Sequence, residues 1–231
     1  SKIRKLKLEK IIVRRKEKQC IENDNPNLHP VLQRVIRQRN CQYTRYDLKD
    51  LERPADLKNI DYVAEKIITY IKNQTPIIIV GDYDCDGATA TAVAVKGLQL
   101  LGHRTVDYLI PNRFKSGYGL SPEIVDQALK RRIKPGVIIT VDNGISSIEG
   151  IDYALGRNIE VIVTDHHLPG ENLPKTAAII NPQLKGDQFK SKAICGVGVI
   201  FYVLLAVRKR MAENGAYADK KQPNFIDLLD M

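Results

Sequence analysis

Short groups of acidic and imidazole side chains follow three apolar runs in this sequence. Carboxylates only a few ångströms apart repel one another, so a protein that gathers them usually neutralises them with a bound divalent cation. Oxygen ligands suit Mg²⁺ or Mn²⁺, and imidazole can complete such a centre. The groups are Asp82, Asp84 and Asp86 after residues 76–80, Asp142 after residues 137–141, and Asp165, His166 and His167 after residues 161–164.

The apolar runs before these groups are predicted to be strands of one sheet. From residue 75 onward, apolar runs alternate with helical patterns, so the predicted fold is α/β, with a parallel sheet sandwiched between helices. Ligands of such sheets bind beyond the carboxyl ends of the strands. The three groups are therefore expected to meet at one edge, where they could hold two cations about 3.5–4 Å apart. The predicted strands are residues 76–81, 105–110, 136–141, 160–164 and 177–180, and the predicted helices are residues 87–101, 121–132, 146–157 and 197–211.

The first 73 residues differ in character from the rest. Residues 1–19 hold nine Lys or Arg and two Glu, while the net charge of the whole chain is +9. The positive charge therefore gathers in an N-terminal arm, which either contacts phosphates or is a solvated leader. Apolar residues recur at helical spacing in residues 30–38 and 56–72. We predict a basic arm with a helical N-terminal extension over residues 1–73 and a catalytic domain over residues 74–231.

Composition excludes several classes of protein. Hydrophobic residues make up 43% of the chain, which is enough for a packed core and argues against disorder. No apolar stretch is long enough to cross a bilayer, and the N-terminus does not resemble a signal peptide, so a cytoplasmic protein without a membrane partner is expected. The four cysteines form no CxxC pair, which argues against a zinc ribbon or a thioredoxin-like site.

Other motifs for binding metals or phosphates fit less well. Residues 82–87 also match the first half of a calcium-binding EF-hand loop, but the twelfth position of that loop is Val93 instead of Glu. No Lys follows Gly87 as in a nucleotide-binding P-loop, and the chain has no Gly-x-Ser-x-Gly nucleophile elbow.

Two further segments could contact a phosphorylated substrate. In the loop 111–119, Arg113 could bind phosphate and Tyr118 could stack on a base, but a glycine-rich surface turn would have the same composition. Gly196 and Gly198 open the last predicted helix. Backbone N–H groups there could bind an anion, although close helix packing would explain the glycines equally well.

Long motifs make one family resemblance specific. The sequence resembles the DHH phosphoesterase superfamily and, within it, the bacterial exonucleases specific for single-stranded DNA. This resemblance implies a 5′-to-3′ exonuclease of recombination and repair that uses two Mn²⁺ or Mg²⁺ ions. Cys85 and Cys195 stand where the family pattern leads us to expect Ala, and both are small enough to leave the site intact. The matching segments are residues 81–89, 110–121, 141–145, 164–170 and 195–198.

The resemblance also implies a role for each residue of the predicted centre. Asp82, Asp84 and Asp86 would supply ligands to both ions, Asp142 would bridge them, and His166 would bind one of them. His167 would contact the scissile phosphate, and Asp165 would orient a neighbouring histidine. Water activated by the cations would attack phosphorus in line with the leaving oxygen. The implied partners are single-stranded DNA, a single-strand-binding protein and a helicase.

The resemblance further implies a ligand Asp and additional domains downstream of residue 231. We therefore expect weak or no activity from the 231-residue chain, and the apolar end of the sequence at residues 227–231 suggests a fragment. Two alternatives stay open. One is another DHH phosphoesterase, acting on pyrophosphate, short oligonucleotides or cyclic dinucleotides. The other is a non-catalytic replication adaptor with the same fold, although such adaptors usually lose ligands that are all present in this span.

Overall fold

The computed structural model describes residues 29–39, 50–112, 118–176 and 178–229. The chain divides into two compact units, residues 1–51 and 52–231. In the first unit the described element is α1 (Pro30–Arg39), which confirms the helix predicted for residues 30–38. None of the helices in the described ranges is long and apolar enough to cross a membrane.

The second unit is built on a parallel sheet of five strands. The strand order is β2-β1-β3-β4-β5, and every neighbouring pair is parallel. The order reverses at β1, which has β2 on one side and β3 on the other, and ligands of such sheets bind at this kind of reversal. The predicted parallel α/β fold is confirmed. The strands are β1 (Ile77–Val80), β2 (Val106–Leu109), β3 (Val137–Val141), β4 (Glu160–Thr164) and β5 (Ile179–Ile180).

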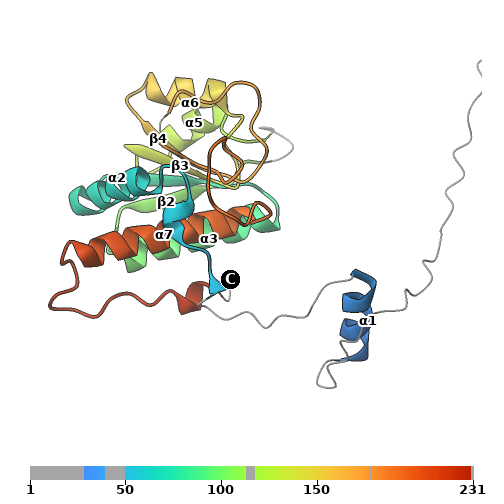
Figure 1. Cartoon of the computed structure of the whole chain (residues 1–231). Coiled ribbons are helices and arrows are strands. Elements are labelled where there is room, and N and C mark those ends of the chain that lie inside the picture. The colour runs from blue at the N-terminus through green and yellow to red at the C-terminus, as the bar shows by residue number, and fades with distance from the viewer. Residues whose placement is uncertain (1–28, 40–49, 113–117, 177, 230–231) are drawn as a thin grey trace, which may run out of the picture. The chain divides into compact units, whose positions relative to one another are not determined.

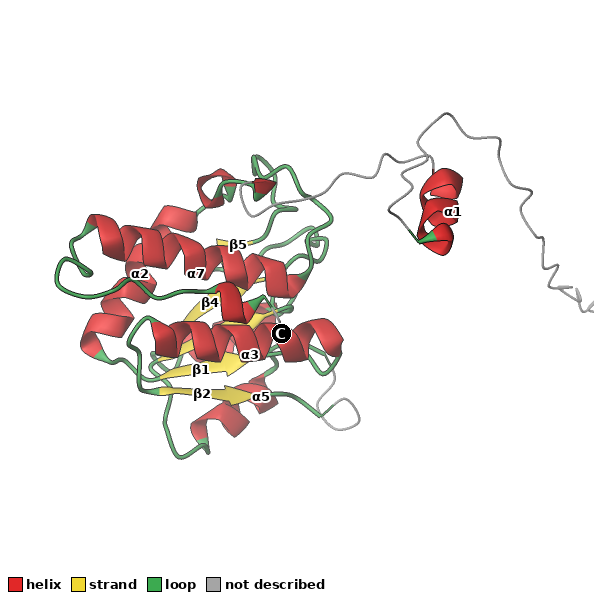
Figure 2. Cartoon of the chain, turned by 90° about the horizontal axis from the view of Figure 1, so that it is seen from below, coloured by secondary structure: helices red, strands yellow, loops and turns green. Residues whose placement is uncertain are grey.

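Helices cover both faces of the sheet (Figures 1 and 2). Ile77 and Ile79 of β1 face the core under α2, α3 and α7, while Ile78 and Val80 face the core under α5 and α6. Because both faces are buried, β1 and β3 are continuous apolar runs without polar alternation. The helices are α2 (Ile60–Asn73), α3 (Cys85–Leu100), α5 (Pro122–Leu129), α6 (Ile148–Leu155) and α7 (Gly196–Glu213).

The division between the two compact units falls after residue 51. The expected division after residue 73, between an N-terminal extension and a catalytic domain, stays a prediction. The helix α2 belongs with the sheet domain, and the short helix η2 (Pro54–Asp56) precedes it there. One face of α2 is buried in the core that α2 shares with α3 and α7, including Val63 and Ile67. Helical periodicity predicted α2 itself but could not show that this apolar face packs against elements more than 100 residues later in the chain.

His103 leads to a prediction about stability. It is 1% exposed, and neither ring nitrogen makes a well-formed hydrogen bond within the described residues. Burial lowers the pKa of His103, and the nearby backbone of Thr105 and Thr75 opposes this shift only in part. A histidine whose pKa is lowered by folding contributes stability above its ordinary pKa of about 6.5, and that stability is lost as the pH falls.

We therefore expect His103→Leu to flatten the decline of the melting temperature between about pH 7 and pH 5. Thermal unfolding of wild type and variant across this range measures the slope. The exposed His29 provides the control substitution His29→Leu. If His103→Leu left the slope of melting temperature against pH unchanged, the buried imidazole would not be the source of that slope.

Candidate metal centre

The first acidic group occupies the turn from β1 to α3. Asp84 is the N-cap of α3 and accepts a hydrogen bond of 2.9 Å from the backbone N–H of Gly87. Asp82 accepts a bond of 2.7 Å from the backbone of Tyr83. A Cβ atom at Gly87 would lie 2.5 Å from the Cβ of Asp82. The glycine therefore lets the start of α3 pack directly against Asp82, which fixes both carboxylates at the strand end.

Asp86 joins α3 to α7. Its two carboxylate oxygens accept hydrogen bonds from the backbone N–H groups of Gly196, at 2.7 Å, and Val197, at 2.8 Å. A carboxylate in this place is stabilised by the positive end of the helix dipole. The Oδ2 atom of Asp86 also lies 3.6 Å from Nε2 of His166. The backbone N–H groups of Gly196 and Val197 are therefore bonded to Asp86, and the roles of Gly196 and Gly198 in substrate binding stay a prediction.

Asp142 lies at the centre of the group. It is 1% exposed and has a φ of 60°, in the left-handed region that residues other than glycine seldom adopt. Burial, followed by the neighbouring charges of Asp86, Asp84, Asp165 and Asp82, raises the pKa of Asp142 to about 8. A backbone strained in this way at a strand end places the carboxylate where the other groups converge.

The third group is organised around Asp165. Its Oδ1 accepts hydrogen bonds from the backbone of His166, at 2.7 Å, and of His167, at 3.1 Å, and lies 2.7 Å from Nδ1 of His167. Its Oδ2 accepts a bond of 2.9 Å from the backbone of Ile145. These contacts fix the imidazole of His167, as expected of a residue that orients a histidine. The neighbouring His166 places Nε2 3.1 Å from Oδ1 of Asp142.

Tyr118 closes one side of the centre. Its hydroxyl donates a hydrogen bond of 3.1 Å to the backbone carbonyl of Asp142 and lies 3.2 Å from Nδ1 of His167. Burial and the surrounding carboxylates raise the pKa of Tyr118 above its ordinary value, so the phenol keeps its proton. The side chain is 50% exposed. The stacking role predicted for it stays a prediction, and the structure adds a contact to the histidine.

The predicted ligands converge as two overlapping sets. Asp142, His166 and His167 form one set, and Asp82, Asp84 and Asp142 form the other; within each set the ligand atoms lie within 4.8 Å of one another. Asp142 belongs to both sets, which suits a carboxylate between two ions. Asp86 lies beside them through its contact with His166. Arg113 lies outside the described residues.

Two buried asparagines support the centre, and neither was predicted as a site residue. Asn143 donates hydrogen bonds to the carbonyls of Val80 and Val141, and so ties the ends of β1 and β3 together. Asn181 follows β5 and donates a bond of 2.9 Å to the carbonyl of His167. The signal for both was their place directly after an apolar run, where a polar side chain meets the ligand edge.

The residues present fit divalent cations. The buried Oδ1 atom of Asp142 makes no well-aligned hydrogen bond within the described residues, and it lies 3.1 Å from Nε2 of His166, an atom that can itself bind a metal ion. A carboxyl with a pKa of about 8 needs either a proton or a cation near neutral pH. Oxygen ligands with one or two imidazoles fit Mn²⁺ or Mg²⁺. Asp82, Asp84, Asp86, Asp142 and His166 are the residues that would hold the ions.

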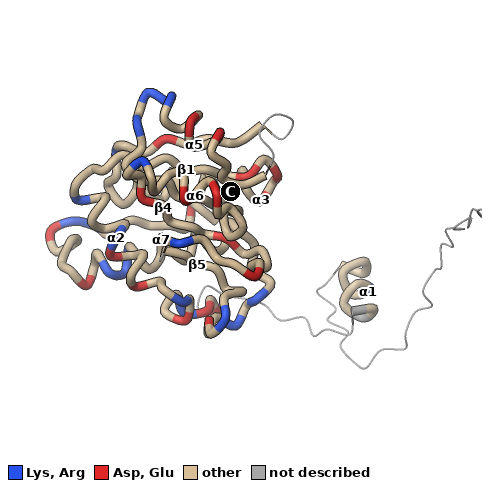
Figure 3. The backbone as a smooth tube through the Cα atoms, turned by 90° about the horizontal axis from the view of Figure 1, so that it is seen from above, with Lys and Arg blue, Asp and Glu red and all other residues tan. Residues whose placement is uncertain are grey.

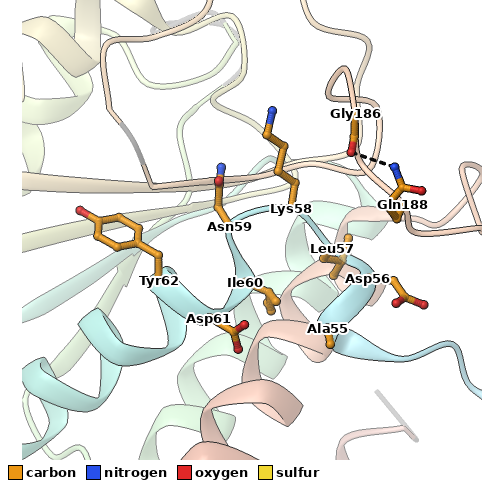
Figure 4. Close-up of a pocket in the computed structure, with 10 residues that line it drawn as sticks. All are labelled: Ala55, Asp56, Leu57, Lys58, Asn59, Ile60, Asp61, Tyr62, Gly186 and Gln188. Atoms are coloured by element: carbon orange, nitrogen blue, oxygen red, sulfur yellow. Dashed lines mark hydrogen bonds between the residues drawn. The ribbon is translucent and has the colours of Figure 1, made fainter.

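A separate groove of about 500 Å³ lies at the start of α2 (Figure 4). The loop on its other side is fixed by a bond of 2.7 Å from the backbone of Lys58 to Asp187, and Gln188 donates a bond of 3.2 Å to the carbonyl of Gly186. No group of metal ligands within the described residues lies there. The groove is therefore distinct from the candidate metal centre.

Comparison with known proteins assigns the domain. The family "DHH family, N-terminal domain" matches residues 76–229, a span that contains all three ligand groups. The chain belongs to the DHH family. The DHH span begins one residue before β1, so α2 and η2 precede it as additions to the sheet domain.

Several relatives of this DHH chain are named RecJ. The single-stranded-DNA-specific exonuclease RecJ of Haemophilus influenzae is 45% identical over 206 residues, which are 88% of this chain and 36% of the relative. RecJ of Escherichia coli is 42% identical over 228 residues, covering 96% of this chain and 39% of the relative. A crystal structure of exonuclease RecJ bound to manganese has a TM-score of 0.61 and 35% identity, and covers 72% of this chain and 40% of that one. The chain thus spans about two fifths of the length of these relatives.

Proposed function

We propose that the chain is the catalytic part of a metal-dependent exonuclease that hydrolyses phosphodiester bonds of single-stranded DNA from the 5′ end. The observation that carries the proposal is the position of Asp142, which belongs to both sets of ligand atoms. A shared buried carboxylate suits two cations at the spacing that phosphoryl transfer requires. The similarity to the RecJ exonucleases supports the choice of substrate.

The protein residues hold and orient the reacting groups. Asp165 accepts the hydrogen bond of Nδ1 of His167, so Nε2 is the atom left to meet a metal ion or a phosphate oxygen. Tyr118, bonded to the carbonyl of Asp142, restricts the position of that imidazole. Asp86 holds the start of α7 against the centre and keeps His166 beside Asp142. When bound, the cations supply charge neutralisation and activation of water.

The wider setting follows from the same assignment. A DNA-processing enzyme of this kind would act in the cytoplasm on strands exposed during recombination and repair, beside a single-strand-binding protein and a helicase. The similarity to RecJ is the support for this part of the proposal. Manganese in a related RecJ crystal structure supports Mn²⁺ as a cofactor, with Mg²⁺ as the chemical alternative.

Hydrolysis assays with Mn²⁺ test the activity and its direction. Because weak activity is expected of the 231-residue chain, the readouts are the direction of digestion and the ratio of the rates on different substrates, and not the absolute rate. A strand labelled at its 5′ end is expected to release a labelled mononucleotide at once, whereas a strand labelled at its 3′ end should shorten progressively and keep its label. The rate on single-stranded DNA should exceed that on pyrophosphate or a cyclic dinucleotide by more than about 10-fold in kcat/KM. A faster rate on either small substrate would instead identify another DHH phosphoesterase.

A further inference from the structure

Exposed cations that form no ion pair within the described residues gather at the amino edge of the sheet, where the strands begin. This edge is opposite to the metal centre, because the strands are parallel and the ligand groups follow their carboxyl ends. We name these exposed side chains the amino-edge patch. It consists of Lys72, Arg104, Lys130, Arg132, Lys134 and Arg157.

Backbone hydrogen bonds place the segments of the patch side by side. The N–H of Ile77 donates to the carbonyl of Thr105, and the N–H of Gly136 donates to the carbonyl of Pro76. The N–H of Glu160 in turn donates to the carbonyl of Gly136. The starts of β2, β1, β3 and β4 are therefore neighbours, and the cations that flank them share one edge.

Acidic side chains nearby do not neutralise the patch. Asp107 forms an ion pair of 2.9 Å with Arg131, and Glu160 pairs with Lys66. Asp126 accepts a hydrogen bond of 2.9 Å from the hydroxyl of Tyr153. Within the described residues, no member of the patch has an ion-pair partner.

The amino edge therefore holds cations that no ion pair within the described residues neutralises, while the ligand groups lie at the carboxyl edge. Figure 3 shows Lys and Arg gathered in the loop beyond α5, and Asp and Glu near the start of α3. None of the predicted metal ligands lies at the amino edge, and the positive electrostatic potential of the exposed cations there attracts polyanions.

We propose that the amino-edge patch binds the phosphate backbone of single-stranded DNA, as a second contact for the strand whose end lies at the metal centre. The inference rests on the proposed function, which supplies DNA as the polyanion. Binding by neutralisation of phosphates needs no apolar groove.

The depth of the sheet sets the length of DNA that reaches both edges. The strand β3 has 5 residues and at 3.3–3.4 Å per residue spans about 17 Å. A strand of about two nucleotides in the metal centre is too short to reach the patch, whereas a strand of about 30 nucleotides has length to spare. The patch should therefore affect long substrates and not short ones.

A charge-reversed variant tests the patch by binding alone. Lys130→Glu, Arg132→Glu and Lys134→Glu are combined, and anisotropy of a labelled strand of about 30 nucleotides is measured in EDTA. Affinity should fall by more than about 10-fold, and the slope of log K against log salt should decrease by about 2, since each phosphate contact contributes about 0.7. The control combines Lys209→Glu, Lys220→Glu and Lys221→Glu, which changes the net charge equally at exposed positions of α7 and of the segment that follows it.

The outcomes separate the patch from the nuclease. If the patch variant loses affinity for DNA and the control keeps it, the proposed DNA contact is supported even if no hydrolysis is found. The binding measurement does not depend on metal. Hydrolysis of a strand of about two nucleotides at the wild-type rate by the patch variant shows that the metal centre is unaffected. Equal loss in both variants, loss in neither, or competition by polyglutamate as strong as that by DNA would overturn the proposal. Circular dichroism and thermal melting confirm that both variants are folded.

Discussion

Asp142→Ala is expected to abolish the uptake of Mn²⁺ and with it every metal-dependent hydrolysis. Asp142 is the one residue shared by the two ligand sets among the described residues, so its loss removes a ligand from both ions at once. Loss of a partner outside the ligand shell already lowers metal affinity by about 10–100-fold, so loss of this shared ligand should lower it by more than about 100-fold. Titration calorimetry and the electron paramagnetic resonance of free Mn²⁺ measure the uptake directly.

A matched control excludes a general effect of removing a carboxylate. Asp152 lies on α6, partly exposed, and pairs with Lys175 at 3.4 Å. Asp152→Ala should leave Mn²⁺ uptake as in wild type. If wild type and Asp142→Ala took up Mn²⁺ equally, neither the shared site nor the nuclease assignment would stand. In the absence of metal, Asp142→Ala should also be folded, because the variant removes a buried carboxylate that desolvation disfavours.

The sequence predicted the parallel sheet because its strands are short, apolar and separated by helical patterns. That inference also brought the ligand groups to one edge, since all strands of a parallel sheet end on the same side. Periodicity could not identify the packing partner of α2, since an apolar helix face fits any apolar surface. It also predicted a strand over residues 177–180, of which Ile179–Ile180 form β5, residue 178 does not belong to it, and residue 177 lies outside the described residues.

The roles within the centre depended more on three-dimensional contacts. Spacing and residue type predicted the ligands, but the bonds from α7 to Asp86 join residues 110 positions apart. The contact of Tyr118 with the carbonyl of Asp142 likewise depends on the path of a loop with no periodic pattern. Asn181 was missed because a single polar residue after an apolar run is too weak a signal by itself.

Gly196→Ala is expected to weaken both the fold and the metal centre. A Cβ atom at Gly196 would lie 2.4 Å from Oδ1 and 2.6 Å from Cβ of Asp142, closer than atoms in contact can be. Either the start of α7 or the Asp142 carboxylate must therefore move, and the bonds from Gly196 and Val197 to Asp86 would be disturbed. Overpacking of this kind costs about 1–3 kcal/mol, which corresponds to about 5 °C in melting temperature. We expect Mn²⁺ affinity to fall by more than about 10-fold.

Gly198→Ala is the matched control, two residues along the same helix. Its new Cβ would lie 2.6 and 2.8 Å from side-chain atoms of Ile194, and 3.7 Å from Sγ of Cys195, which is an ordinary contact. An isoleucine side chain can adjust, and Ala favours a helix over Gly by about 1 kcal/mol, so the two effects should nearly cancel. Melting curves in EDTA and Mn²⁺ isotherms compare the variants. Wild-type Mn²⁺ affinity in Gly196→Ala would show that α7 does not set the position of Asp142, and the coupling between the last helix and the metal centre would have to be abandoned.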